Sequence, residues 1–258
     1  MLYLPKESAV SKPEPEFGGQ LRADPDIHTD WPQYFKERAD MARDPRLQGY
    51  YRAGMVAGDT PLKDAPLLAV DFETTGLNAR KHGIVSIGAV PFDLQRIRLR
   101  QARYWLLKPR RSLTDDSVVI HGITHSDIAQ APDLDDVLAC VLDAFKGYVW
   151  VVHFRGIERD FFKQALIERI GERIEFPVID TMQLEARFHR SDNRPWWQRW
   201  RPQPKVSIRL ADSRARYGLP HYSPHDATTD ALACAELLQA QAAHFFSPDT
   251  PLNQIWVP

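Results

Sequence analysis

Cysteine is scarce in this chain, with two among 258 residues, Cys140 and Cys234. Both fall in Ala- and Leu-rich stretches of helical character, where a free cysteine usually packs as a small core residue. So low a count excludes a disulfide framework and a zinc site built from cysteines. The chain also lacks any run of 18 apolar residues, and no long apolar segment follows its first residues. We therefore expect a soluble, cytoplasmic protein with no membrane partner.

An excess of charge of one sign is absent as well, because 33 Lys and Arg residues face 34 Asp and Glu residues. The chain has no overall positive charge that would indicate a polyanionic partner, so any binding of nucleic acid must depend on a local group of basic residues. The hydrophobic content of 43% in 258 residues is sufficient for one sizeable core. One main domain is the expected organisation.

Composition divides the chain into three parts. Residues 1–62 are predicted to form an N-terminal arm, extended at first and then aromatic-rich with one or two short helices at 28–54. These helices could bind a partner such as a polymerase, although the burial of their apolar surface favours docking on the main domain. The main domain is assigned to residues 63–246, and residues 247–258, with three prolines, are expected to form a C-terminal tail.

Hydrophobic patterns in the main domain predict an α/β fold. Strands at 67–70, 84–92 and 96–107 are joined by short connections, which favours an antiparallel arrangement. Two further strands, at 148–152 and 176–179, alternate with helices, so the sheet should be mixed and flanked by helices. The helical segments are expected within 134–145, 153–171, 181–188, 208–217 and 223–246.

Two carboxylates, Asp71 and Glu73, stand two residues apart at the end of the first predicted strand. Side chains at this spacing point to the same face of a sheet. Two neighbouring acids raise each other's pKa unless a cation lies between them, and a hard divalent metal ion is one remedy. The alternative is that both simply face water. The turn that follows contains Thr74, Thr75 and Gly76, and the glycine allows the backbone to approach a ligand closely.

Residues 71–76 form the motif D-x-E-T-T-G, and His225 precedes Asp230 by five residues on a predicted helix. In these two motifs the chain resembles the DnaQ-like 3′-to-5′ exonucleases of the DEDDh group, the family of the proofreading epsilon subunit and of ribonuclease T. Residues 121–132 resemble the segment between the family's motifs, and the resemblance covers about residues 65–245. It implies a ribonuclease-H-like architecture and hydrolysis of phosphodiester bonds at 3′ ends.

The middle motif departs from the family pattern, which is usually H-N-A-x-F-D-x-x-F-L. His153, Phe161 and Phe162 set the register here, and in that register the acidic position is Glu158. Asp160 is the alternative, but it lies about 200° further around the helix and should face elsewhere. A glutamate carries the same charge on a longer arm, so metal chemistry should survive. His153 is expected to brace the loop before Glu158.

The residue types agree with the metal site that the resemblance implies. Oxygen ligands alone suit two divalent ions, Mg²⁺ or Mn²⁺, and suit zinc poorly. In such sites the ions stand about 3.5 to 4 Å apart, one activating water and the other stabilising the leaving oxygen. His225 is the expected general base, because imidazole titrates near neutrality; the alternative is an ordinary capping or surface histidine. The expected metal ligands are Asp71, Glu73, Glu158 and Asp230.

Other positions are assigned to the substrate by resemblance. Leu77 would wedge against a base, or it is ordinary core; His121 would line the nucleotide pocket, or it is buried against backbone. The insertion at 189–205 interleaves tryptophans with arginines, a composition that binds single strands, although its tryptophans could instead pack on the domain. The candidate substrate-binding residues are Thr74, Thr75, Gly76, Leu77, His121, Ile123, Trp196, Trp197 and Trp200.

Three functions are compatible with these features. The first is a metal-dependent 3′–5′ exonuclease that releases nucleoside 5′-monophosphates from single-stranded DNA or RNA, which needs four carboxylates and His225. The second is a nucleic-acid-binding or regulatory module with weak or lost hydrolysis, and only Glu158 points to it. The third is a proofreading subunit of a polymerase complex, tethered through the N-terminal arm. The presence of all five residues favours the first function.

Overall fold

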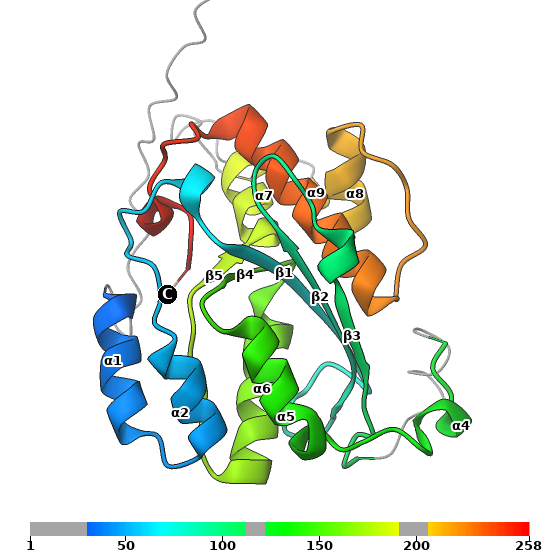
Figure 1. The fold of residues 1–258 in the computed structure, drawn as a ribbon. Helices are drawn as coiled ribbons and strands as arrows, with labels where there is room; N and C mark the ends of the chain where they lie inside the picture. The colour runs from blue at the N-terminus through cyan, green and yellow to red at the C-terminus, as the bar shows by residue number, and fades with distance from the viewer. Residues whose placement is uncertain (1–29, 112–121, 191–205, 258) are drawn as a thin grey trace, which may run out of the picture.

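The computed structural model of the chain describes residues 30–111, 122–190 and 206–257. A five-stranded sheet forms its centre (Figure 1). The strands are β1 (Leu67–Thr74), β2 (Ile84–Phe92), β3 (Arg103–Leu106), β4 (Val149–Val152) and β5 (Val178–Asp180). Their order is β3-β2-β1-β4-β5, in which the first three are antiparallel and β4 and β5 join in parallel. The predicted mixed sheet is confirmed.

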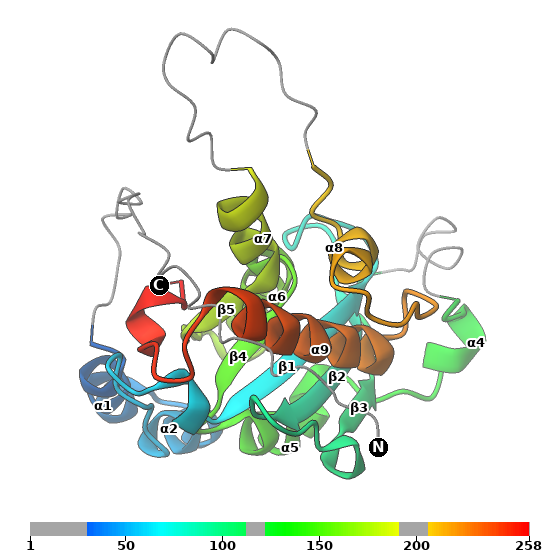
Figure 2. The ribbon, with the colours of Figure 1, turned by 90° about the horizontal axis from the view of Figure 1, so that it is seen from above.

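Helices cover both faces of the sheet (Figures 1 and 2). They are α1 (Trp31–Met41), α2 (Pro45–Arg52), α4 (His125–Ile128), α5 (Leu134–Phe145), α6 (Arg155–Ile170), α7 (Thr181–His189), α8 (Leu210–Arg216) and α9 (Ala227–Phe245). On one face α7 and α9 cover the strands and α8 packs against α9, while α5 and α6 cover the other face. Within the described ranges, no helix has the length and apolar character needed to cross a membrane.

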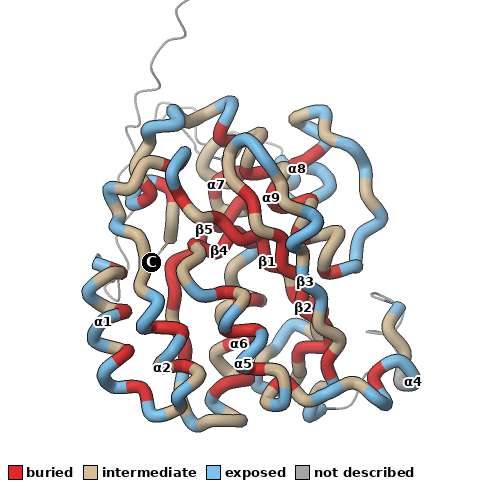
Figure 3. Tube along the Cα trace, viewed as in Figure 1, coloured by how far each residue is buried: buried red, intermediate tan, exposed pale blue. Residues whose placement is uncertain are grey.

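The central strands of the sheet are mostly buried (Figure 3). The alternation of side chains along β1 separates two buried clusters. Leu67 and Ala69 point into the cluster beneath α9, and Leu68 and Val70 point toward α5 and α6. By the same two-residue period, Asp71 and Glu73 lie on the α9 side. β1 continues through Thr74, four residues further than predicted, because β2 pairs with it along this length. Both carboxylates therefore lie within the strand rather than after it.

The helices α1 and α2 are part of the core, as the docking interpretation predicts. Trp31, Phe35 and Tyr51 are buried in the cluster that also contains the inner side chains of α5 and α6. The Tyr51 hydroxyl accepts a hydrogen bond of 3.0 Å from the backbone N–H of Glu175. Their aromatic surface is therefore covered by the chain's own domain. Residues 1–29 lie outside the described ranges.

Two strands differ from their predicted limits. The third strand is restricted to Arg103–Leu106, and the prediction of 96–107 is wrong. The Asp93 carboxylate accepts hydrogen bonds from the backbone N–H groups of Gln95 and Arg96, which turns the chain. A 3-10 helix at Leu99–Gln101 follows. β5 begins two residues later than predicted and includes Asp180.

The last described residues pack on the domain and do not form the loose tail that was predicted. Leu252 and Ile255 are buried, and residues 252–254 form a short 3-10 helix. Val257 forms an isolated bridge with Val178 of β5. Two buried apolar side chains and backbone pairing thus attach this segment to the domain.

The two cysteines occupy different environments. Cys234 is buried on α9, as predicted. Cys140 is exposed, and its predicted place in the core is wrong. The buried side of α5 is formed by Leu138, Val141 and Phe145, and Cys140 lies outside that stripe.

Candidate active site

The carboxylates of β1 lie beneath the first turn of α9. In the sheet Asp71 is paired with Gly88 of β2, so the two residues share a row on the α9 side. Gly88 has no side chain, and the backbone of Ala227 lies directly above it. A glycine inside a strand often marks such a close approach of two backbones. This contact brings Asp230, in the first turn of α9, next to the acids of β1.

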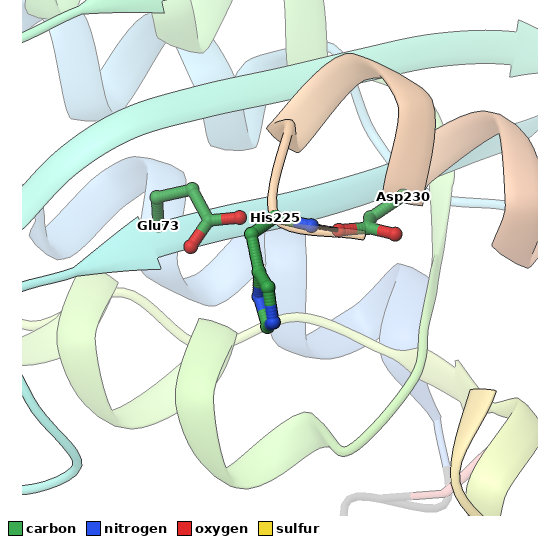
Figure 4. Close-up of side chains that lie close together, drawn as sticks. All are labelled: Glu73, His225 and Asp230. Atoms are coloured by element: carbon green, nitrogen blue, oxygen red, sulfur yellow. Dashed lines mark hydrogen bonds between the residues drawn. The ribbon is translucent and has the colours of Figure 1, made fainter. Parts of the chain in front are cut away.

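Three predicted residues form the tightest group of the site. Glu73, His225 and Asp230 come from β1, the loop before α9 and the first turn of α9, and a ligand atom of each lies within 4.8 Å of the others (Figure 4). The backbone N–H of His225 donates to Asp230 Oδ2 at 2.6 Å. Asp226 caps α9 by accepting from the N–H of Thr229 at 2.8 Å. Asp71 and Glu158 lie outside this tightest group.

Glu158 lies in the first turn of α6 and is 2% exposed, whereas Asp160 is exposed. Its Oε2 atom is buried and finds no hydrogen-bond partner in the described part of the chain. A buried carboxylate oxygen without a partner is costly unless a cation neutralises it. The structure therefore favours Glu158 over Asp160 as the third acid.

The pKa values indicate how closely the carboxylates converge. Burial raises the pKa of Asp71 well above its ordinary value, and repulsion from Asp230 and Glu73 raises it further. Burial, followed by repulsion from Asp230, raises the pKa of Glu73 to about 7. Burial raises the pKa of Glu158, and repulsion from Asp71 raises it further. Burial also raises the pKa of Asp230, although the hydrogen bond from the backbone N–H of His225 acts in the opposite direction. Asp71 is thus close enough to the other three acids to interact electrostatically with each of them.

The site fits divalent metal ions on two observations. Four carboxylates destabilise one another's charged forms, and an oxygen of Glu158 is buried without a partner. A cation bound among them would relieve both. The donor set of carboxylate oxygens, with one imidazole beside it, suits Mg²⁺ or Mn²⁺.

The turn after β1 is held by its own hydroxyl groups. Thr75 is buried, and its Oγ1 accepts from the backbone N–H of Gly83 at 3.1 Å. The Thr74 hydroxyl donates to the carbonyl of Gly76 at 2.8 Å. Leu77 is 87% exposed, so the alternative that it belongs to the core is wrong. Its contact with a base stays a prediction.

His153 links three segments around the site. One ring nitrogen lies 2.8 Å from the Thr181 hydroxyl and the other 3.0 Å from the carbonyl of Ile208. Both nitrogens are therefore engaged within the protein. This arrangement agrees with the predicted bracing role and leaves no ring nitrogen for a substrate.

Several predicted substrate residues lie outside the described ranges. Ile123 is described, and it packs partly buried against Val85 and Ile128, so its place beside a nucleotide stays a prediction. The predicted substrate-binding residues that lie outside the described ranges are His121, Trp196, Trp197 and Trp200.

The sequence analysis missed a buried arginine beneath the His225 loop. Arg214 donates to the carbonyls of Ala233 and Pro220 at 2.6 and 2.9 Å and to Glu236 at 2.7 Å. Its guanidinium carbon lies 4.6 Å from the centre of the Tyr222 ring. The loop that ends at His225 is thereby attached to α8 and α9. No pattern distinguishes this arginine from exposed ones, because its partners are distant in sequence.

Known proteins share the sequence pattern of this domain. The exonuclease family model matches residues 68–238. The DNA polymerase III epsilon subunit of Treponema pallidum is 28% identical over 176 residues, which are 68% of this chain and 76% of that protein. A PolC-type DNA polymerase III of Thermotoga maritima is 30% identical over 129 residues, 50% of this chain but only 9% of its own length.

Solved structures share the fold. Exonuclease X in complex with 5′ overhanging duplex DNA has a TM-score of 0.53 and 22% identity, over 72% of this chain and 98% of that chain. The nuclease domain of 3′hExo, a DEDDh family member bound to rAMP, has a TM-score of 0.57 and 16% identity, over 69% of this chain and 92% of its own. These similarities confirm the predicted ribonuclease-H-like architecture.

Proposed function

This chain belongs to the DnaQ-like family of 3′–5′ exonucleases, and we propose that it releases nucleoside 5′-monophosphates from the 3′ ends of single-stranded DNA or RNA. The observation that carries the proposal is the convergence of Asp71 with Glu73, Glu158 and Asp230 at one end of the sheet. Repulsion from neighbouring acids disfavours the charged forms of Asp71, Glu73 and Glu158, and cations bound among them would relieve it.

The family depends on divalent metal ions, and the four carboxylates are the residues that would hold two of them, Mg²⁺ or Mn²⁺. When bound, such ions lower the pKa of a water molecule and stabilise negative charge on the phosphate oxygens. The unpaired oxygen of Glu158 supports its place among these ligands.

His225 is the proposed general base. The hydrogen bond from its backbone N–H to the Asp230 carboxylate holds His225 at the start of α9. The His225 side chain is exposed. None of the described residues forms a hydrogen bond with its ring. The imidazole can therefore accept a proton from the attacking water.

The test is hydrolysis of matched 5′-labelled single-stranded DNA and RNA oligonucleotides with Mn²⁺, Mg²⁺ or EDTA. Stepwise shortening from the 3′ end, abolished by EDTA and by Asp71→Ala, is the expected result. Thermal unfolding would verify that the variant is folded. A folded wild-type protein that binds the strands in Mn²⁺ but cleaves neither would contradict hydrolysis and favour the regulatory module.

A role in proofreading is a second candidate, supported by the similarity to a polymerase III epsilon subunit. The aromatic faces of α1 and α2 are buried, so a polymerase would have to contact another surface, such as residues 1–29. Proofreading predicts faster removal of a mismatched than of a matched primer terminus. Equal rates on both termini would argue against it.

The Trp-rich insertion is proposed to hold the single strand upstream of the cleaved bond. Its composition of tryptophans among arginines supports this proposal. Changing Trp196, Trp197 and Trp200 together to Ala should raise the KM for oligonucleotides. An unchanged KM would leave the insertion with a structural role only.

A further inference from the structure

Phe154 has an unusual backbone and an unusual exposure. Its φ and ψ are 93° and 78°, in the left-handed region, and its side chain is 49% exposed. Among the described residues, His225 is the other non-glycine residue with a positive φ. A bulky residue in this region is strained, and such strain persists where the surroundings enforce it, often at functional sites.

A buried carboxylate enforces this conformation. Asp180 is 3% exposed at the end of β5, and its two oxygens accept from the backbone N–H groups of Phe154 and Arg155, both at 3.1 Å. The same carboxylate caps α7 by accepting from Met182 and Gln183. The left-handed turn is thus anchored to two elements.

The ring of Phe154 lies over a glycine. A Cβ on Gly156 would lie 3.2 Å from the Cζ atom of the ring, so the absence of a side chain there makes room for it. The ring is therefore supported by the first turn of α6, and the residue as a whole is 49% exposed to solvent. Glu158 follows two residues further along the same turn.

The position of this ring relates it to the candidate active site. β1 and β4 are adjacent and parallel, with Ala69 opposite Val151, so their carboxyl ends lie at the same edge of the sheet. Leu77 lies three residues after β1 and is 87% exposed, and Phe154 lies two residues after β4. Two exposed apolar side chains thus follow the strands beside which the acids converge.

We propose that Phe154 is a stacking platform for a nucleobase of the substrate strand, adjacent to the nucleotide that is removed. The inference rests on the proposed function and adds a base-binding position to it. An aromatic face is the appropriate partner, since every nucleobase offers a π-face and stacking tolerates any sequence. The ring lies against Gly156 and the residue is about half exposed, so the proposal places the base on the part of the ring that α6 does not cover.

The test combines kinetics with a fluorescent base. Phe154→Ala should raise the KM for a short oligonucleotide about tenfold, as expected for loss of one stacked base, with kcat within about twofold. Phe154→Trp should keep the wild-type KM, and Phe154→Leu should behave like the alanine variant because it is apolar but has no ring. Met41→Ala, which removes another exposed apolar side chain, is the matched control.

Stacking is read directly from an oligonucleotide with 2-aminopurine next to its 3′-terminal nucleotide. Its fluorescence should be quenched by Asp71→Ala protein and recover when Phe154→Ala is added to that background. Phe154→Gly is the second variant, since it removes the ring without strain at positive φ and keeps the test valid if the alanine variant is unstable.

Two results would overturn the proposal. One is unchanged KM and quenching in a folded Phe154→Ala or Phe154→Gly protein. The other is a fall in kcat with unchanged KM, which would assign Phe154 to the placement of Glu158. Failure of the proposed function is distinguishable, because it would show as absence of hydrolysis by wild type, whereas the quenching measurement requires no hydrolysis.

Discussion

Ala227, the first residue of α9, occupies the space that a side chain on Gly88 of β2 would need. A Cβ on Gly88 would lie 2.2 Å from the carbonyl carbon and oxygen of Ala227, far inside van der Waals contact. Because Gly88 is paired with Asp71, the same contact sets the separation between Asp71 and the helix that carries Asp230. One missing side chain therefore sets the spacing of the proposed metal ligands.

Gly88→Ala should displace the start of α9 and separate its acid from those of β1. We expect a loss of stability of about 1–3 kcal/mol from overpacking and a much larger loss of hydrolysis, about a hundredfold, because catalysis depends on ligand geometry. Thermal unfolding and Mn²⁺-dependent hydrolysis measure the two effects. Gly49→Ala is the control, since nothing lies within 4 Å of its Cβ position in α2. Full activity of Gly88→Ala would refute this role.

Glu158→Gln should separate function from stability. The change removes a buried, unpaired charge, so the metal-free protein should become more stable by about 1–3 kcal/mol. Hydrolysis should fall at least about a hundredfold, because a metal ligand is lost. Asp160→Ala, at an exposed position two residues on, should change neither quantity. If Asp160→Ala abolished hydrolysis and Glu158→Gln did not, the assignment of the third acid would be wrong.

The relative placement of the acids could be predicted because it depends on local periods. A two-residue period in a strand places Asp71 and Glu73 on one side, and the helical period separates Glu158 from Asp160. These relations hold whatever surrounds the segment. The mixed sheet followed for the same reason, since the lengths of the connections limit the pairing of strands.

Contacts between distant segments could not be predicted in the same way. Arg214 is buried because Glu236 and two carbonyls from other segments surround it, and no local pattern contains that information. Leu252 and Ile255 pack although prolines surround them, because the domain offers them an apolar surface. Gly88 carried a usable signal, as a glycine inside an apolar strand, but its partner on α9 was not predictable.

The stability of the metal-free protein should fall as pH rises through the range in which Glu73 ionises. Its pKa is raised from its ordinary 4.5 to about 7 in the folded protein. The folded state therefore binds the proton that the unfolded state has released, and stability declines between these two values. This group alone accounts for about 3 kcal/mol. Above pH 7, Mn²⁺ should restore the stability by binding the ionised carboxylates.

The measurement is the unfolding free energy in EDTA at pH 5.5 and 8, for wild type and Glu73→Gln. The difference between the two proteins cancels other titrating groups, such as His153, whose pKa burial lowers. Wild type should lose more stability than the variant between these pH values. A smaller loss of stability in wild type than in Glu73→Gln would show that Glu73 is not buried among like charges.

Arg214 should determine how firmly His225 is held. Arg214→Met keeps the length of the side chain but leaves the carbonyls of Ala233 and Pro220 and the carboxylate of Glu236 without their donor. We expect a loss of stability of about 3 kcal/mol, since breaking a buried charge pair leaves its partner uncompensated.

The same variant should lower kcat about tenfold or more, because a loosened loop holds the general base in the wrong place. Binding of Mn²⁺ should change much less, since Asp71 and Glu158 do not depend on that loop. Arg209→Met, at an exposed position just before α8, is the matched control and should leave both quantities unchanged. A folded Arg214→Met protein with wild-type kcat would show that the loop keeps His225 in place without the hydrogen bonds of Arg214. Equal losses of kcat and of Mn²⁺ affinity would show instead that Arg214 positions α9 as a whole.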